Sequence, residues 1–357
     1  MQVRENFRLD AVNSRPILLI GAGGIVQDAH LPGYRKAGFQ VAGICDIDWQ
    51  RAQRVAERFG VEKVYGEPAS AIAQASPETI FDIAIPPGNI LDILPLLPDR
   101  SAVLIQKPMG LDIGQARAIR DLCRKKKLIA AVNFQLRFAP PITAAKEMIA
   151  QGLIGEVHEM EVRINVFTPW HLWPFLEDLP RVEIPMHSIH YLDLIRSFLG
   201  EPTAIWARTS KHPCTPKLAS ARSSMILDYG DWVRAMVTTN HGHKYGPHNQ
   251  EAFVKWEGNR GAIKVTLGLL MDYPKGVPDR FEYCILESAG PPVWHTRPIE
   301  GSWFPDGFIG VMQSLMSFLD GTSPVLPTSV EDAYRTMELV EAAYQSDASG
   351  GVRIAHA

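Results

Sequence analysis

The chain has 357 residues, 46% of them apolar and 21% charged, and a formal net charge of −3, which favours a globular protein of two domains. No basic stripe favours a nucleic-acid partner, and no apolar run approaches the ~20 residues of a membrane-spanning helix. Four cysteines without a Cys-x-x-Cys pair and a polar N-terminus without an apolar signal core predict a cytoplasmic protein with neither a zinc site nor a disulfide framework.

Short apolar strands alternate with helices in the first part of the chain. Strands are expected at 16–20, 39–45, 64–65, 80–85, 103–105 and 129–134, and helices at 24–36, 49–59, 69–74 and 111–126. Asp48 is the expected N-cap of the helix that begins at Trp49. The alternation predicts an α/β fold, in which residues 14–135 form a doubly wound parallel sheet covered by helices on both faces.

The pattern changes after about Phe134. Helices are expected at 141–151, 184–199, 308–319 and 329–345, and longer strands at 157–167, 203–209, 223–228, 232–239 and 252–256. Polar and apolar residues interleave in these strands, which indicates an antiparallel sheet with one solvated or interface face. Residues 136–357 are therefore predicted to form a second α/β domain, with the C-terminal helix packing back on the first domain.

A glycine loop follows the first strand and opens a helix. Gly21, Gly23 and Gly24, with Ile25 directly after them, let a pyrophosphate approach the backbone at a helix N-terminus. Asp46 ends the second strand at the distance expected for the acid that binds the adenosine ribose. Its carboxylate repels a 2′-phosphate, so we predict NAD as the cofactor, with NADP less favoured. Val26 stands where the fingerprint prefers Gly or Ala, which predicts a slightly displaced helix.

The ligand-binding edge of this sheet carries further candidates. Val103–Ile105 ends in Gln106, Lys107 and a proline, and polar groups at the carboxyl end of a parallel strand can act on a bound ligand. Gln106 and Lys107 are therefore predicted to contact the cofactor. For Pro86 and Pro87, which follow the fourth strand, lining the cofactor cleft and merely stopping the strand remain equal alternatives.

These motifs, together with others further along, resemble the family of glucose-fructose oxidoreductase, inositol 2-dehydrogenase and the rhizopine-catabolism oxidoreductases (Gfo/Idh/MocA). The shared segments are Gly21-Ala-Gly-Gly-Ile, His30-Leu-Pro, Ile44-Cys-Asp46, Gln106-Lys-Pro108, Asn133-Phe-Gln-Leu-Arg-Phe-Ala-Pro140, Gly152-Leu-Ile-Gly155, His190-Tyr-Leu-Asp193 and Ser329-Val-Glu-Asp-Ala-Tyr-Arg335. The resemblance implies a Rossmann domain followed by an α/β domain with a large open antiparallel sheet. That sheet is commonly a dimer interface in the family, which implies a homodimer or homotetramer.

The resemblance also assigns catalytic roles. His190 matches the family's catalytic histidine, and an imidazole suits a general base at neutral pH. Lys107 matches the lysine of the family's Glu-Lys-Pro, where a cation stabilises developing alkoxide charge. Asp193, one turn after His190, either orients the imidazole or is a surface acid. Met186 departs from the acid that many relatives carry four residues before the histidine, and Gln106 replaces the glutamate.

Two other segments are candidates for contact with substrate. The aromatic loop 168–175 contains Trp170 and His171, and His187 lies one turn before the predicted base, so these three side chains are predicted to bind a carbohydrate or polyol. For the loop, a packed or interface segment is an equal alternative. A second segment contains His241, His243 and His248, for which a substrate rim or an oligomer contact is favoured over a metal site.

The sequence thus predicts an NAD-dependent dehydrogenase that acts on CH–OH groups of a sugar, cyclitol or sugar acid. Two alternatives remain open. One is a redox-neutral relative that uses NAD transiently to cleave glycosides or eliminate a group, and the other is a non-catalytic NAD-binding sensor.

Overall fold

The computed structural model describes residues 15–273, 275–287 and 290–351. The chain divides into two compact units. Of the described residues, the first unit holds 15–140 together with Gly301–Met337, and the second holds Pro141–Glu300 together with 338–351. Within the described part of the chain, no helix is both long and apolar enough to cross a membrane.

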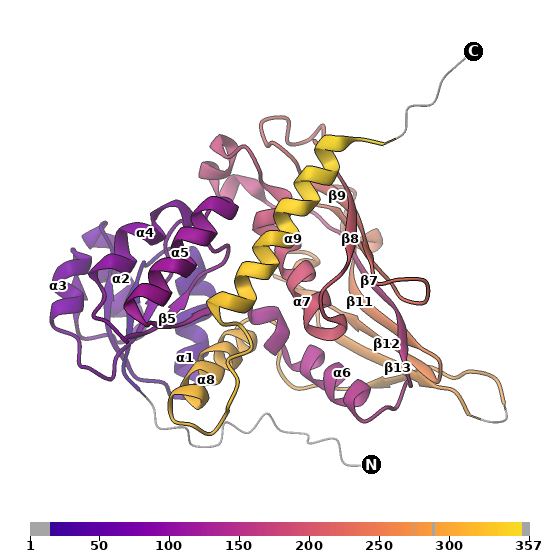
Figure 1. Ribbon diagram of the computed structural model, residues 1–357, viewed down its shortest axis with the longest axis horizontal. Helices are drawn as coiled ribbons and strands as arrows, with labels where there is room; N and C mark the ends of the chain where they lie inside the picture. The colour runs from indigo at the N-terminus through magenta and orange to yellow at the C-terminus, as the bar shows by residue number, and fades with distance from the viewer. Residues whose placement is uncertain (1–14, 274, 288–289, 352–357) are drawn as a thin grey trace. The chain divides into compact units, whose positions relative to one another are not determined.

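The first unit is built on a six-stranded parallel sheet, as the sequence predicts (Figure 1). Its strands are β1 (Ile17–Ile20), β2 (Val41–Cys45), β3 (Val64–Tyr65), β4 (Ile80–Ile83), β5 (Ala102–Ile105) and β6 (Ile129–Val132). They lie in the order β3-β2-β1-β4-β5-β6, and the side chains of β1, β4 and β5 are entirely buried. The order reverses between β1 and β4, and ligands of doubly wound sheets bind beside that reversal, at the carboxyl ends of the strands.

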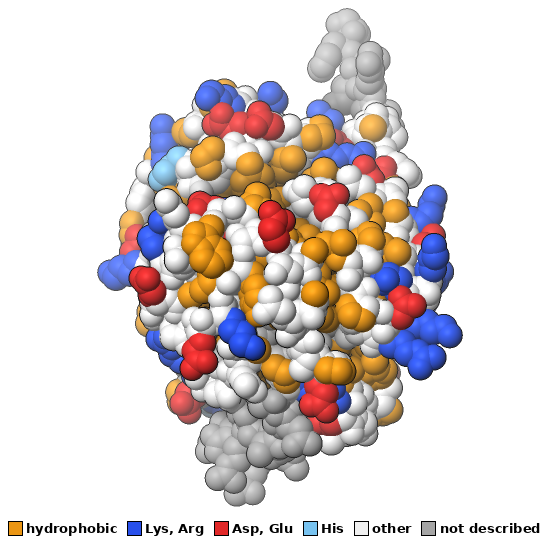
Figure 2. Space-filling view, turned by 90° about the vertical axis from the view of Figure 1, so that its left-hand side faces the viewer, with side chains coloured by type: hydrophobic (Ala, Val, Ile, Leu, Met, Phe, Trp, Pro, Cys, Tyr) orange, Lys and Arg blue, Asp and Glu red, His pale blue; other side chains and the backbone are white. Residues whose placement is uncertain are grey.

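Helices cover this sheet. They are α1 (Leu31–Ala37), α2 (Trp49–Phe59), α3 (Pro68–Ala73), α4 (Ile90–Ile93), α5 (Ile113–Lys126) and α8 (Asp306–Leu319). Asp48 caps α2, as predicted, by accepting a hydrogen bond from the Arg51 backbone N–H. On the side that bears α2 and α3, apolar side chains are interrupted by acidic and basic ones (Figure 2). The short helix α4 was not predicted, and it forms part of the crossover that parallel strands β4 and β5 require.

The helix expected at 24–36 differs from the prediction at its start. It opens with a π-helical turn, η1 (Val26–His30), before α1 begins. Pro32 lies in the first turn of α1 and has no backbone N–H to bond to the preceding turn. The wider turn accommodates this missing donor.

The second unit contains an eight-stranded sheet in the order β14-β13-β12-β11-β7-β10-β9-β8 (Figure 1). The strands are β7 (Val157–Asn165), β8 (Ala204–Ser210), β9 (Arg222–Asp228), β10 (Arg234–Asn240), β11 (Glu251–Gly258), β12 (Gly261–Thr266), β13 (Arg280–Ile285) and β14 (His295–Arg297). All pairs are antiparallel except β7 with β10. The sheet is therefore largely antiparallel, as predicted, although β12, β13 and β14 were not anticipated.

One face of this sheet is buried and the other is open. In β9, for example, Ser223, Met225 and Leu227 are buried while Ser224 and Ile226 between them are exposed. Three further α-helices follow Ala139 besides α8: α6 (Pro140–Ala150), α7 (Ile189–Leu199) and α9 (Val330–Ser349). The first residues of α9, up to Met337, belong to the first unit. The helix predicted at 184–199 is continuous, but its first turn, η7 (Ile184–Ser188), is π-helical.

Candidate functional site

The glycine loop lies between β1 and η1, at the carboxyl edge of the parallel sheet. Gly21 has a φ of +114°, and a Cβ there would overlap the carbonyl oxygen of Ala84, just after β4. No other residue fits this crossing between the two strands. At Gly23, in contrast, no described atom lies within 4 Å of an added Cβ. The loop thus leaves open space beside the start of the helix, which is the arrangement that a pyrophosphate requires.

Asp46 joins the end of β2 to this loop. Its Oδ2 accepts a hydrogen bond from the backbone N–H of Ala22 at 2.7 Å. Its Oδ1 accepts from the backbone N–H of Asp48 at 2.8 Å and from the guanidinium of Arg51 at 2.9 Å. The carboxylate therefore stands where a Rossmann fold holds the adenosine ribose. The glycine loop and Asp46 together fit a dinucleotide. Sequence reasoning missed Arg51, because nothing in its spacing marks it as a partner of Asp46.

The same edge carries the residues that follow β4 and β5. Pro86 is exposed and Pro87 is half-buried, and both lie shortly after the Ala84 carbonyl that Gly21 crosses. After β5 ends at Ile105 come Gln106 and then Lys107, whose side chain is partly buried. Burial lowers the pKa of the Lys107 ammonium from 10.5 to about 8. The cause is removal of the ammonium from water.

A buried hydrogen-bond network supports Gln106. The carboxamide of Asn133 donates to Gln106 Oε1 at 2.8 Å and lies 3.4 Å from Nε2 of His30. His30 Nδ1 lies 2.7 Å from Oδ2 of Asp82, which also accepts from the hydroxyl of Tyr34 at 2.7 Å. His30, Tyr34, Asp82 and Asn133 are all 0% exposed. The sequence signal that was available is Asp82, a carboxylate in the middle of an otherwise apolar strand.

In the second unit, His190 lies in the first turn of α7 and is 5% exposed. Asp193, three residues later, is 1% exposed. Of the two alternatives for Asp193, the surface acid is therefore wrong. Met186 packs against an apolar cluster centred on Trp170, which explains why an apolar side chain is accommodated at that position.

The aromatic loop and the turn that precedes α7 meet in this unit. The ring centroid of Trp170 lies 4.9 Å from that of His187, with the rings nearly perpendicular. Trp170 is 7% exposed and anchors the cluster formed with Leu176 and Val182. His171, the other candidate in the loop, is exposed and takes no part in this contact. Of the three predicted substrate residues, the fold thus brings two together.

The three histidines of the segment after β10 enter different environments. His241 is buried, His243 is half-buried and hydrogen-bonded to Asn165, and His248 is exposed. In the described residues, no three His, Cys, Asp or Glu side chains gather closely enough to hold a metal ion. The segment therefore does not act as one ligand set.

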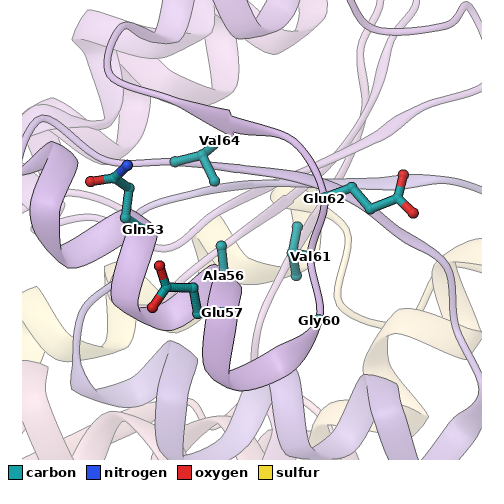
Figure 3. Close-up of a pocket in the computed structure, with 7 residues that line it drawn as sticks. All are labelled: Gln53, Ala56, Glu57, Gly60, Val61, Glu62 and Val64. Atoms are coloured by element: carbon teal, nitrogen blue, oxygen red, sulfur yellow. The ribbon is translucent and has the colours of Figure 1, made fainter.

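A separate hollow lies at the other edge of the parallel sheet. It has a volume of about 340 Å³ and is bounded by the end of α2 and the segment that leads into β3 (Figure 3). Apolar and polar side chains line it about equally: Ala56, Val61 and Val64 on one hand, and Gln53, Glu57 and Glu62 on the other. Ligands of doubly wound sheets bind at the carboxyl ends of strands, whereas this hollow adjoins the start of β3. It is not the cofactor site.

The parallel sheet with its glycine loop and acid, together with the large open sheet of the second unit, defines an NAD-binding oxidoreductase of two domains. The chain belongs to the GFO/IDH/MocA oxidoreductase family. Residues 15–134 match its part described as "Oxidoreductase family, NAD-binding Rossmann fold", and residues 142–264 match the GFO/IDH/MocA C-terminal domain.

Curated relatives cover most of the chain at low identity. The chain is 26% identical over 324 residues to D-apiose dehydrogenase from Rhizobium rhizogenes, which covers 88% of this chain and 89% of that protein. It is also 26% identical over 204 residues to D-glucoside 3-dehydrogenase from Escherichia coli, covering 54% and 56% of the two chains.

Solved structures share the whole fold. An oxidoreductase from Agrobacterium radiobacter, in complex with NAD+, L-tartaric acid and magnesium, matches with a TM-score of 0.77 and 25% identity over 95% of this chain and 97% of that one. Levoglucosan dehydrogenase in complex with NADH and levoglucosan has the same TM-score at 19% identity, covering 94% and 97% of the two chains, which shows a common fold.

Proposed function

We propose that this protein is an NAD-dependent dehydrogenase that transfers a hydride between the nicotinamide and a CH–OH carbon of a sugar, cyclitol or sugar acid. The observation that carries the proposal is Lys107. It is a partly buried cation with a pKa of about 8, on the same sheet edge as the glycine loop and Asp46. A cation of this kind stabilises an alkoxide oxygen as the hydride leaves its carbon.

The proposed roles follow from the chemistry of each side chain. NAD, when bound, supplies the hydride acceptor. Gly21, Gly23, Gly24 and Ile25 would hold its pyrophosphate, and Asp46 its adenosine ribose. His190 would take the hydroxyl proton as general base, since an imidazole titrates near neutral pH. Lys107 would polarise the reacting oxygen, with Gln106 beside it.

The proposed substrate contacts come from the second unit. His171 would reach the substrate from the aromatic loop, while Trp170 and His187 would form the wall on which a sugar ring packs. Relatives with names such as D-apiose dehydrogenase, D-glucoside 3-dehydrogenase and inositol 2-dehydrogenase favour a polyhydroxylated substrate. Sugar acids and neutral sugars are treated as one class of candidate substrate, because both present a secondary hydroxyl that can be oxidised.

We also propose a cytoplasmic homo-oligomer that assembles through the open sheet. The outer face near β8 and β9 presents Trp206, Ile226 and Trp232, which are 58%, 46% and 88% exposed. Large apolar side chains grouped on one sheet face are typical of an interface. Light scattering coupled to size exclusion tests this. A mass of two or four chains supports it, and a monomer at working concentration contradicts it.

The test of function follows NADH absorbance with purified protein, NAD and a panel of candidate substrates. The panel contains D-apiose, D-xylose, alkyl D-glucosides, levoglucosan, myo-inositol and aldonic acids. A substrate-dependent rise in NADH that His190→Ala abolishes, with NAD binding retained, supports the proposal. NAD binding without turnover of any member of the panel contradicts it and favours redox-neutral chemistry or a sensor.

A further inference from the structure

A carboxylate and an imidazole are buried together in the second unit, apart from the residues assigned above. Glu183 is 0% and His241 1% exposed, and His241 Nε2 lies 3.3 Å from Glu183 Oε1. The hydroxyl of Ser188 donates to the same oxygen at 2.7 Å. Burial opposes the charged carboxylate, but the hydrogen bond and charge of His241, aided by the hydroxyls of Ser223 and Ser188, hold the pKa of Glu183 below its usual value. At neutral pH the carboxylate is ionised and accepts the Nε2–H of His241.

The other side of His241 holds the aromatic loop. Its Nδ1 lies 2.8 Å from the hydroxyl oxygen of Thr168, the residue with which the loop begins. The backbone N–H of Thr168 also donates to the carbonyl oxygen of His241 at 3.1 Å. The buried pair is thus linked to the loop through both a side chain and the backbone.

The ring of His241 also contacts two predicted substrate residues. Its centroid lies 4.5 Å from that of His187 and 5.4 Å from that of Trp170. Since Trp170 and His187 touch each other as well, the three rings form a closed group. His187 precedes His190 by one turn, so the group joins the aromatic loop to the start of the helix that carries the proposed base.

Stability alone does not account for this arrangement. Burying a carboxylate with its hydrogen-bond partner adds little to stability over well-packed apolar side chains of the same volume. What the arrangement adds is direction, because each ring nitrogen of His241 faces its own partner: Nε2 lies 3.3 Å from the carboxylate of Glu183 and Nδ1 2.8 Å from the hydroxyl oxygen of Thr168. Here the carboxylate fixes the plane of an imidazole, and the imidazole fixes a hydroxyl and two rings.

We propose that Glu183 and His241 are a positioning pair for substrate binding, which holds Thr168, Trp170 and His187 in the orientation that a polyhydroxylated substrate requires. This inference rests on the proposed function. Neither residue of the pair contacts the reacting atoms. Loss of the pair therefore weakens substrate binding and leaves the binding of NAD unchanged.

The kinetic test uses Thr168→Val and Thr168→Ser. Valine removes the hydroxyl at nearly constant shape, so we expect KM for the substrate found by the panel to rise about tenfold, the effect of losing one hydrogen bond. The value of kcat should change by less than about threefold. Serine keeps the hydroxyl and should restore KM. The matched control is Thr209→Val, since the Thr209 hydroxyl donates to Asp347 at 2.7 Å in the same unit but outside this group. Equal KM values for the two valine variants would overturn the proposal.

A spectroscopic test does not depend on turnover. Nitrogen-15 labelling of the eleven histidines, with signals assigned by His187→Gln and His241→Gln, reports the protonation of each ring. Glu183→Gln removes the charge at nearly constant shape, and we expect the signals of both His241 and His187 to move. A shift confined to His241 would mean that the pair does not reach the substrate residues, which also overturns the proposal.

The two tests separate this inference from the proposed function. If the wild-type protein turns over no member of the panel but the His187 signal moves in Glu183→Gln, the dehydrogenase proposal fails while the coupling of the pair to the loop stands. If turnover is found but Thr168→Val behaves as its control does, the dehydrogenase proposal stands and the positioning role of the pair fails. Should Glu183→Gln fail to fold, the Thr168 variants still decide, because that side chain is only half-buried.

Discussion

The Oδ2 atom of Asp46 accepts a hydrogen bond from the backbone N–H of Ala22 at 2.7 Å, across two neighbouring strands and 24 residues of chain. The acid and the glycine loop, which sequence motifs treat as separate signals, are therefore one structure. The other oxygen of Asp46 is held by the guanidinium of Arg51. A carboxylate and a cation thus stand together where the adenosine ribose is expected.

This arrangement predicts how cofactor choice can be changed. Asp46→Ser removes the carboxylate and leaves Arg51 to meet a 2′-phosphate. We expect the Kd for NADH to rise about tenfold or more, the effect of losing hydrogen bonds to a charged group, and the Kd for NADPH to fall relative to it. Fluorescence titration with both nucleotides measures this. Asp48→Asn is the control, since asparagine caps α2 equally well. An unchanged ratio of the two Kd values would show that Asp46 does not choose the cofactor.

Two glycines of the same loop should respond differently to alanine. Gly21→Ala places a side chain at positive φ and against the Ala84 carbonyl, so we expect a loss of stability of about 1–3 kcal/mol or more. Gly23→Ala meets no described atom within 4 Å, so the fold should be retained. NAD binding should nevertheless weaken, because the methyl group enters the space proposed for the pyrophosphate. Thermal unfolding and NADH titration measure the two effects, and full NAD affinity in Gly23→Ala would place the pyrophosphate elsewhere.

The Lys107 ammonium is expected to lower the stability of the folded protein, although the proposed reaction needs it. Its pKa in the folded state, about 8, lies below the ordinary value of 10.5, so the folded state binds the proton less tightly than the unfolded state. The penalty is full below pH 8 and disappears as the pH rises from about 8 to 10.5. We expect Lys107→Met to unfold at a higher temperature than the wild type at neutral pH, with the difference shrinking through that window, and to lose most of its turnover.

Calorimetry across this pH range, with NADH titration at neutral pH, checks the prediction. Lys36→Met is a suitable control, because the Lys36 ammonium is largely exposed and paired with Asp306. A stability difference for Lys107→Met that is independent of pH would contradict the assignment of a buried ammonium. Unchanged turnover would remove Lys107 from the catalytic proposal.

The buried network under Gln106 predicts a graded series. Asp82→Ala leaves His30 and Tyr34 without their shared acceptor in the core, so we expect a loss of about 3–5 kcal/mol, as for one partner of a buried pair. Tyr34→Phe removes only one donor and should cost about 1 kcal/mol. Urea unfolding followed by fluorescence measures both. Equal losses in the two variants would mean that the hydroxyl, and not the His30 contact, carries the stability of the network.

Short apolar runs between turn residues predicted every strand of the parallel sheet, although the two residues of β3 are only half-buried. Residue type and spacing predicted the cap at Asp48 and the acid at Asp46, whose spacing from the glycine loop is set by one strand and one helix. The strands β12, β13 and β14 were missed. The alternation is nevertheless present in β12, where buried Ile263 and Val265 flank half-buried Lys264, which pairs with Glu282 of β13.

The candidate site shows the same division. Local order marked Lys107, at a strand end, and Trp170, in an aromatic loop, whereas His190 was marked by its match to the family's catalytic histidine. Glu183 and His241 are 58 residues apart, and no local pattern links them. The same is true of His30 with Asp82, which lie 52 residues apart.

The sequence by itself therefore determined the strands of the parallel sheet, the nucleotide-binding loop with its acid, and the family. These depend on interactions between residues close in the chain, where spacing translates directly into geometry. The tertiary structure alone decided which polar groups are buried together. It also decided that the Lys107 ammonium is removed from water and that, among His241, His243 and His248, it is His241 that faces a carboxylate. Such pairings form only when distant strands and helices pack, since burial removes the water that would otherwise satisfy each group separately.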